Sequence, residues 1–351
     1  MPKLDASKLS ALKTLLKKNK LDGLIISDVK DLKYILGKNI FFFQNEGILL
    51  AYDKGLYLAA RSLYKIPLSS EYPEIKIEGF DYCRENKIIE TAKKLKLKNV
   101  AFDFNKEMYY SGKAYIKAGF KEFASLIASL RVSKTETELE IMRRSAKIVY
   151  GALPYIKKLL KIGVTEKEIA AKLDDYMMSK GASGTSFTTL VSFGPNGANP
   201  HHMPGDFKLK NNMPIMLDFG CVYQNYCSDI TRTFWYGNKP SAEFKKIFDI
   251  VKTAHDKAAK EAKYGMTGAQ IDAIARSQIE AAGYGKYFTH RTGHGIGIEA
   301  HEEADISRLN KNKIGLNYCF SIEPGIYLEG KFGVRYEDCF YMTKNGTKIL
   351  N

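Results

Sequence analysis

The feature that most constrains the fold is a recurring pattern, in which a pair of helices is followed by β-like sequence. The second helix of each pair is predicted to begin with a capping box, formed by Thr165 with Glu168 and by Thr267 with Gln270. β-like sequence follows the first pair over 186–235, and more follows the second pair up to the C-terminus. This repetition predicts an internally duplicated α+β domain with a site between its two halves.

A boundary between two domains is predicted just before this duplicated region. Ser133 and Glu136 match a third capping box, which would begin a long helix. A chain of 351 residues is also longer than one ordinary hydrophobic core requires. We therefore expect a smaller α/β domain over residues 1–130 and the duplicated domain over 131–351.

The first 130 residues alternate between helix and strand signals. One helix face is predicted from four leucines, Leu9, Leu12, Leu15 and Leu16. Gly23 stands where that helix would stop. Strands are predicted at 24–26, 47–52 and 56–60. This region contains no cluster of chemically active side chains, which favours a structural role.

The formal net charge of +15 raises the question of a nucleic-acid partner. The excess is nearly all lysine dispersed along helices, whereas arginine, which dominates base readout, is scarce. Dispersed lysine is typical of a solvated surface rather than a binding stripe, so no nucleic-acid partner is predicted.

Location is predicted from the first residues and from the cysteines. Residues 1–10 are polar, and no stretch approaches the roughly 18 apolar residues of a membrane span. The five cysteines form no Cys-x-x-Cys pair, and an odd number is typical of reduced thiols. No membrane partner and a cytoplasmic location are therefore expected.

Two aspartates in neighbouring β-like segments form the first candidate site. If residues 224–225 are a two-residue hairpin loop, Asp218 opposes Thr231 and lies diagonal to Asp229, on the same face. Two such acids are costly to bury unless a cation lies between them, and oxygen ligands suit divalent ions. In the alternative, one aspartate is a turn residue and the other pairs with Arg232; the hairpin alone does not decide.

Three of the six histidines, His290, His294 and His301, fall within a dozen residues in a glycine-rich segment. Glycines there are expected to give the backbone clearance around a ligand. Their spacing does not match a dinucleotide fingerprint. The cluster favours a functional site, whereas His255, alone in a predicted helix, is expected to be structural.

Two glutamates, Glu323 and Glu337, stand in apolar β-like sequence, where a carboxylate needs a partner. Arg335 could neutralise one of them, but four inward acids and one arginine still leave negative charge to balance. Four carboxylates and one imidazole make an oxygen-rich site for two divalent ions. Such a site activates water near neutral pH and polarises a carbonyl.

Five segments, in this order along the chain, resemble the pita-bread metallopeptidases: LDFG, SDITRTF, TGHGIG, SIEPGIY and GVRYED. This family includes methionine aminopeptidase, prolidase (Xaa-Pro dipeptidase) and aminopeptidase P. The resemblance covers essentially the whole chain. It implies a C-terminal pita-bread domain with internal pseudo-duplication, preceded by a creatinase-type α/β domain, which methionine aminopeptidase lacks.

The resemblance also implies how two divalent ions would be held. Asp218 matches the bidentate ligand of one ion. Asp229 and Glu337 match two bridging carboxylates, and His294 and Glu323 match the remaining ligands of the other ion. Oxygen-rich ligation favours Mn²⁺, although Co²⁺, Zn²⁺ or Fe²⁺ would fit the same ligands.

Catalytic side chains are implied in the same way. Glu323 matches the proton shuttle, and His201 matches a substrate-contacting histidine in a segment that by itself reads as a loop. His290 and His301 match the two histidines that orient the scissile carbonyl and stabilise its tetrahedral intermediate. Arg335 matches an arginine that supports the ligands or binds a substrate carboxylate.

Two residues beside the site histidines depart from the family pattern. Ala300 replaces a β-branched residue, and Asn199 replaces a commoner apolar one and bears on the substrate pocket. Neither is a predicted metal ligand. Cys221 and Cys227 lie between the two aspartates, and we expect them to pack rather than to bind metal.

The resemblance implies hydrolysis of the bond between a first residue and a following proline, with a proline-containing peptide as substrate and a homodimer as the assembly. Prolidase is favoured because the chain is compact, and aminopeptidase P, which takes longer peptides, is the alternative. A metal-free binding module would show a lost ligand, and all five are present. Creatinase-like hydrolysis fits poorly because the metal carboxylates are retained.

Overall fold

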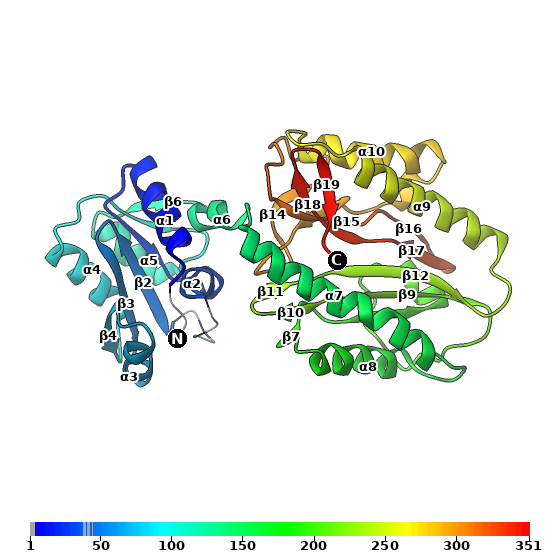
Figure 1. Ribbon diagram of the computed structural model, residues 1–351, viewed down its shortest axis with the longest axis horizontal. Helices are drawn as coiled ribbons and strands as arrows, with labels where there is room; N and C mark the ends of the chain where they lie inside the picture. Colours follow the sequence, from blue (N-terminus) through cyan, green and yellow to red (C-terminus); the bar gives the residue numbers. More distant parts are fainter. Residues whose placement is uncertain (1–3, 38–39, 41–42, 44) are drawn as a thin grey trace. The chain divides into compact units, whose positions relative to one another are not determined.

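The computed structural model describes residues 4–37, 40, 43 and 45–351. Contacts divide the chain into two compact units, Met1–Arg131 and Val132–Asn351 (Figure 1). In the part of the chain that the structure describes, no helix is both long and apolar enough to cross a membrane.

The first unit is built around a six-stranded sheet of order β4-β3-β2-β1-β5-β6, in which β1 is antiparallel to β2 and parallel to β5. Its strands are β1 Gly23–Ile26, β2 Gly47–Tyr52, β3 Gly55–Arg61, β4 Lys76–Phe80, β5 Val100–Asp103 and β6 Lys121–Phe123. Its helices are α1 Ala6–Lys18, α2 Val29–Leu36, α3 Ser62–Glu71, α4 Arg84–Lys94, α5 Tyr109–Lys117 and α6 Leu126–Arg131. The three predicted strands are present, whereas the predicted helix stop at Gly23 is wrong: α1 ends at Lys18, and Gly23 begins β1.

The second unit consists of two halves, each of which is a helix pair followed by β-strands (Figure 1). The first half contains α7 Glu136–Leu159, α8 Glu166–Ser179, β7 Gly184–Thr185, β8 Leu190–Phe193, η1 Gly194–Ala198, β9 Met213–Phe219, β10 Cys221–Tyr223, β11 Tyr226–Cys227 and β12 Ile230–Tyr236. The second half contains α9 Ala242–Glu261, α10 Gly268–Ala281, η2 Gly285–Tyr287, β13 Gly293–Gly295, β14 Glu302–Ile306, β15 Cys319–Ile322, β16 Gly325–Leu328, β17 Phe332–Arg335, β18 Asp338–Thr343 and β19 Gly346–Ile349. Each helix pair packs its apolar face on the strands of its own half, so each half has its own core cluster.

The internal duplication extends to hydrogen bonds at the start of α8 and α10. Thr165 and Thr267 cap these helices with complete capping boxes, as predicted. Each threonine also forms an antiparallel bridge to a later lysine, Lys208 or Lys313. The same local solution therefore occurs once in each half.

One predicted cap is displaced. The capping box of α7 is formed by Thr135 and Glu138, not by Ser133 and Glu136. Ser133 instead donates a hydrogen bond from its hydroxyl to the Leu316 carbonyl at 2.9 Å. Both threonine and serine suit the cap position, and the tertiary contact selects between them.

The hairpin between β9 and β12 has the predicted register. Gln224 and Asn225 form its two-residue turn, with positive φ values of 44° and 75°. Asp218 opposes Thr231 in the antiparallel ladder. The ladder brings the segment after β11, which contains Asp229, back beside the end of β9.

Candidate metal centre and substrate pocket

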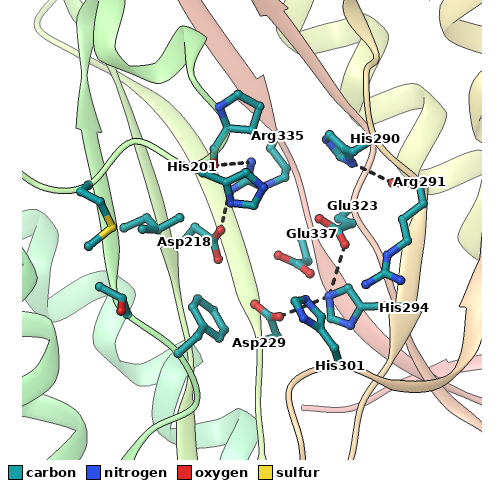
Figure 2. Close-up of a pocket in the computed structure, with 15 residues that line it drawn as sticks. His201, Asp218, Asp229, His290, Arg291, His294, His301, Glu323, Arg335 and Glu337 are labelled. Atoms are coloured by element: carbon teal, nitrogen blue, oxygen red, sulfur yellow. Dashed lines mark hydrogen bonds and ion pairs between the residues drawn. The ribbon is translucent and has the colours of Figure 1, made fainter. Parts of the chain in front are cut away.

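A cavity of about 460 Å³ lies in the second unit, lined by residues from both of its halves (Figure 2). Every predicted site residue lines it: His201, Asp218, Asp229, His290, His294, His301, Glu323, Arg335 and Glu337. Apolar side chains complete the wall on the side of the first half: Phe187, Leu190, Pro200 and Met203. Cys221 and Cys227 are buried but do not line this cavity.

Asp218 and Asp229 reach the cavity from the β9–β12 hairpin. The backbones of Gly220 and Ser228 approach each other closely in this hairpin. A Cβ added to Gly220 would lie 1.9 Å from the Ser228 carbonyl oxygen. Asp218 forms an ion pair with Arg335. The alternative pairing with Arg232 is wrong: that arginine donates to Asp338 at 2.6 Å.

His294 and Glu323 reach the cavity from neighbouring strands of the second half. His294 lies on β13, and Glu323 follows β15, where its backbone N–H donates to the Thr292 carbonyl at 2.7 Å. The His294 Nε2 atom lies 3.3 Å from Glu323 Oε1 and 3.6 Å from Asp229 Oδ2. One imidazole nitrogen therefore faces carboxylates from both halves of the unit.

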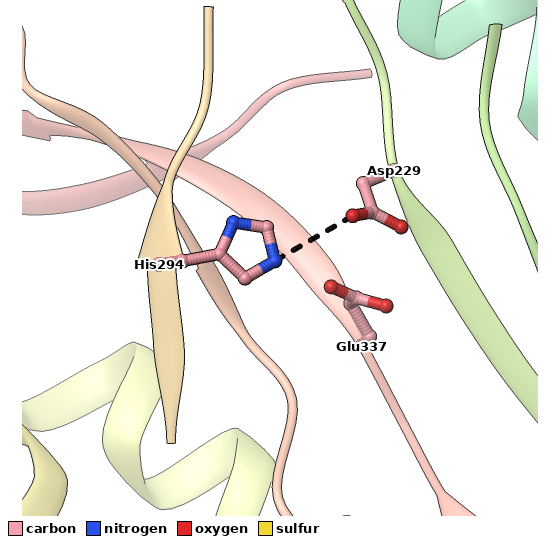
Figure 3. A group of neighbouring side chains, drawn as sticks. All are labelled: Asp229, His294 and Glu337. Carbon is pink, nitrogen blue, oxygen red and sulfur yellow. Dashed lines mark ion pairs between the residues drawn. The ribbon is translucent and has the colours of Figure 1, made fainter. Parts of the chain in front are cut away.

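Glu337 lies between β17 and β18 and is almost fully buried. It forms an isolated antiparallel bridge with Thr231, whose hydroxyl donates to Glu337 Oε2 at 2.7 Å. Through this bridge, Glu337 of the second half lies beside the hairpin of the first half. Glu337 thereby faces Asp229 and His294 (Figure 3).

These side chains suit a divalent cation. Ligand atoms of Asp229, His294 and Glu337 all lie within 4.8 Å of one another. Within the described residues, buried carboxylate oxygens of Asp218, Asp229 and Glu337 have no hydrogen-bond donor. Buried oxygens without donors are costly, and a cation bound among them would remove that cost.

Burial and mutual repulsion raise the pKa values of Asp229, Glu323 and Glu337. Burial, and then the charge of Glu337, raise the pKa of Asp229. Burial, and then the charge of Glu323, raise the pKa of Glu337. Burial raises the pKa of Glu323 to about 7, and burial lowers the pKa of His294 to about 3. The imidazole is therefore neutral, as a metal ligand must be.

Two arginines line the cavity, Arg291 and Arg335, and Arg335 is the buried one. The Arg335 guanidinium is engaged by the protein itself. Besides Asp218, it donates from Nε to the Thr231 hydroxyl at 3.1 Å and from Nη1 to the Tyr327 hydroxyl at 2.8 Å. Nη1 also lies 3.5 Å from the Pro200 carbonyl. These contacts link β9, β12 and β16 around one charge.

Three histidines surround the acids at different depths. His301 is exposed at the cavity edge, and its ring meets that of His294 edge-on with centroids 4.2 Å apart. His201 is also exposed and comes from the first half. His290 is engaged at both nitrogens, with Nδ1 at 2.7 Å from the Arg291 carbonyl and Nε2 at 2.8 Å from the Tyr327 hydroxyl.

The polar residues that were not predicted from the residues themselves are Thr188 and Arg291, which line the cavity, and Tyr327 and Thr231, which bond to its side chains. Tyr327 joins Arg335 to His290, and Thr231 joins Arg335 to Glu337. Both lie inside segments that carry the family resemblance, which was the available signal. Asn199, noted as a departure from the family pattern, accepts a hydrogen bond from the His201 backbone N–H at 3.0 Å and so shapes the turn before this histidine.

Comparison with known families gives two matches that together span most of the chain. Residues 8–133 match the creatinase/prolidase N-terminal domain, and residues 140–344 match metallopeptidase family M24. The chain belongs to metallopeptidase family M24. The predicted pita-bread fold, with a creatinase-type domain before the duplicated one, is confirmed.

Other members of family M24 resemble the chain in sequence and in structure. An uncharacterized peptidase of Staphylococcus epidermidis is 41% identical over 238 residues, which is 68% of each chain. The Xaa-Pro dipeptidase from Bacillus anthracis has a TM-score of 0.91 at 30% identity, covering 98% of this chain and 96% of that protein. The X-Pro aminopeptidase from Thermotoga maritima has a TM-score of 0.86 at 32% identity, covering 96% of this chain and 97% of that protein. As a metallopeptidase of this family, the protein is a hydrolase that uses divalent metal ions.

Proposed function

We propose that the protein hydrolyses the bond between an N-terminal residue and a following proline, with Xaa-Pro dipeptides as its preferred substrates. The observation that carries this proposal is the convergence of five candidate metal ligands, three further histidines and Arg335 in a single cavity. The Bacillus anthracis dipeptidase and the Thermotoga maritima aminopeptidase, which share the fold over nearly their whole length, support the substrate class.

The proposed cofactor is a pair of divalent ions, with Mn²⁺ as the proposed metal because most of the donors are carboxylate oxygens. Asp218, Asp229, His294, Glu323 and Glu337 would hold this pair of ions. Divalent ions at this position supply an activated water near neutral pH and polarise the substrate carbonyl.

Glu323 is the proposed proton carrier. Burial raises the pKa of Glu323 to about 7 in the metal-free protein, which supports a role in proton transfer near neutral pH. It would accept a proton from the attacking water and deliver it to the prolyl nitrogen as the peptide bond breaks. Its carboxylate is anchored by the Ser321 hydroxyl, which donates at 3.3 Å.

Each of the three remaining histidines has its own proposed role in binding the substrate or the oxyanion. Burial lowers the pKa of His301, so its neutral ring has one N–H, which we propose donates to the developing oxyanion. His201 would contact the substrate from the facing wall. His290 would orient the carbonyl. Its Nδ1–H donates to the Arg291 carbonyl, so the neutral ring accepts at Nε2 from the Tyr327 hydroxyl.

For Arg335, the contacts favour one of its two predicted roles. All three guanidinium nitrogens already donate to protein oxygens, and the residue is 3% exposed. We therefore propose that Arg335 fixes Asp218 and offsets the negative charge of the acids. Binding of a substrate carboxylate would require these bonds to be broken.

Hydrolysis of an Xaa-Pro dipeptide measured beside an Xaa-Pro-containing tripeptide tests the substrate proposal. We expect kcat/KM for the dipeptide to exceed that for the tripeptide by roughly tenfold or more, which is about 1.4 kcal/mol of discrimination. A preference for the tripeptide would establish the aminopeptidase P alternative. Absence of bound metal together with absence of hydrolysis would favour the metal-free binding module.

The proposal also covers the roles of the two domains, the oligomeric state and the location of the protein. We assign residues 1–130 to a domain for dimerisation and substrate access and residues 131–351 to the catalytic domain, in line with the two family matches. Sedimentation equilibrium is expected to show a homodimer. A cytoplasmic location is proposed because an odd number of cysteines is typical of reduced thiols.

A further inference from the structure

Glu166, the first residue of α8, is a fully buried carboxylate outside the cavity. Its Oε1 atom accepts hydrogen bonds from the Phe193 backbone N–H at 2.8 Å and from the Asn196 side-chain amide at 2.9 Å. Both donors lie at the start of the segment 193–205, which we call the His201 loop.

The second oxygen of Glu166 holds the other end of the same loop. Oε2 accepts from the Gly205 backbone N–H at 3.0 Å and lies 2.8 Å from His202 Nε2. An ionised carboxylate only accepts, so the imidazole donates from this nitrogen. One buried side chain thus gathers four donors from both ends of the His201 loop.

The His201 loop forms part of the cavity wall. Besides Glu166, Arg335 Nη1 lies 3.5 Å from its Pro200 carbonyl, and its Gly197 packs against the Gly333 backbone. Its residues Pro200, His201 and Met203 line the cavity, yet the last two are exposed. An exposed tip makes few packing contacts, so its position depends on the anchored ends of the loop. Glu166 supplies such an anchor from beneath the loop.

The helix start does not itself require a carboxylate. In the second half, the residue after the cap of α10 is Gly268, which matches Glu166 in the first half. Backbone N–H groups of both residues donate to the segment that returns beside the helix, at the carbonyls of Phe207 and Asn312. The same start therefore forms with no side chain, and burying a carboxylate there is costly unless it serves the loop.

We propose that Glu166 is a positioning residue that holds His201 against the substrate by fixing both ends of the His201 loop. The inference rests on the proposed function for its catalytic consequence, but the anchoring of the loop does not depend on it. Glu166 acts on the reaction only through the loop.

Amide hydrogen exchange of Glu166→Gln tests the anchoring directly. Glutamine presents an amide donor to groups that are themselves donors, so at least one side of the anchor is lost. We expect exchange of the amides in 196–205 to accelerate by roughly tenfold or more. The matched control is Glu168→Gln in the same helix turn, since the capping box accepts glutamine at this position, as Gln270 shows in α10. Unchanged exchange in Glu166→Gln would overturn the proposal.

A double-mutant cycle with His201→Ala tests whether Glu166 acts through this histidine. In the wild-type background, Glu166→Gln should lower kcat/KM for an Xaa-Pro dipeptide about tenfold or more, since small displacements of positioning groups cost at least this much. In the His201→Ala background the further loss should be under about twofold. Additive losses would overturn the proposal.

His202→Phe covers the case in which Glu166→Gln fails to fold. This variant keeps the buried Glu166 carboxylate and removes the His202 donor. It should accelerate hydrogen exchange of the loop and lower kcat/KM, each by less than Glu166→Gln does. Unchanged exchange and kinetics in it would also overturn the proposal. If the wild-type protein cleaves no Xaa-Pro peptide, the proposed function fails, and hydrogen exchange still decides the anchoring role.

Discussion

At the scale of single residues, the site is a set of acids that the metal-free protein holds at a cost. Asp229 and Glu337 are buried, and each has one oxygen without a donor in the described structure. Arg335 forms its ion pair with Asp218 and not with Asp229 or Glu337. A site optimised to bind cations is thus a local source of instability when no cation is bound.

Glu337→Gln is therefore expected to have opposite effects on stability and on activity. In the metal-free protein it removes a repelling carboxyl while keeping an acceptor for Thr231, so the thermal midpoint should stay equal or rise. Turnover of an Xaa-Pro peptide should fall by at least about a hundredfold, because a proposed metal ligand is lost. Thermal unfolding with a chelator and kinetics with Mn²⁺ measure the two effects. A strongly lowered midpoint with near-normal turnover would contradict the two-metal proposal, and Glu303→Gln, an exposed acid outside the cavity, is the control.

Metal binding is expected to release protons at mildly acidic pH. In the metal-free protein Glu323, with its pKa of about 7, carries a proton in most molecules at pH 6, and binding requires the carboxylate. Apparent Mn²⁺ affinity should therefore rise from about pH 5.5 to about 7.5, and the raised pKa values of Asp229 and Glu337 should make it rise further above that range. His294, with a pKa of about 3, is already neutral and contributes no proton in this range.

Titration calorimetry in two buffers of different ionisation enthalpy measures this proton release. Glu323→Gln should release fewer protons than the wild-type protein at pH 6. A heat of binding that is the same in both buffers would show that the carboxyl is already ionised, contrary to the prediction.

At the scale of elements, the β9–β12 hairpin sets the spacing of the two aspartates. Its turn residues adopt positive φ, and its register places Asp218 opposite Thr231. The bend after β9 depends on Gly220, since there is no room for a side chain beside the Ser228 carbonyl. The position of Asp229 is thus a consequence of backbone packing within one element.

Gly220→Ala is expected to destabilise the protein and to weaken metal binding together. The added Cβ would lie 1.9 Å from a backbone oxygen, so the hairpin must shift, at a cost on the order of 1–3 kcal/mol. Chemical denaturation and Mn²⁺ titration measure the two losses. The control is Gly184→Ala in β7, where no atom lies within 4 Å of the added Cβ. Equal behaviour of the two variants would show that the bend tolerates a side chain.

At the scale of the whole molecule, the chemistry belongs to the second unit. All fifteen residues that line the cavity lie between Phe187 and Glu337. The second unit also has two core clusters of its own, one for each helix pair and its strands. It therefore has the apolar interior that a domain needs to fold independently.

A fragment of residues 132–351 is accordingly expected to fold and to bind metal. Circular dichroism and Mn²⁺ titration test this, with Asp229→Asn in the same fragment as the control that should lose binding. If the first unit controls substrate access, as proposed, the fragment should also change the ratio of dipeptide to tripeptide hydrolysis. A folded fragment that binds no metal would contradict the assignment of the whole site to this unit.

Local patterns predicted much of the fold because they rest on short-range physical chemistry. Capping boxes at Thr165 and Thr267, the two-residue hairpin turn and the β-strands of the first unit depend on neighbouring residues alone. One error arose where two local signals were equivalent. Ser133 and Thr135 both suit a helix cap, and only the contact of Ser133 with Leu316 decides between them.

The sequence by itself determined which groups form the site: acids within apolar strands, a histidine among glycines, and their order along the chain. Only the tertiary structure decided how these groups are paired. Arg335 rather than Arg232 forms an ion pair with Asp218, and Tyr327 forms a hydrogen bond with His290. Glu166 accepts hydrogen bonds from the loop that contains His201. Such pairings join residues that are far apart in sequence, so they depend on how the two halves pack and on which buried charges must be satisfied there.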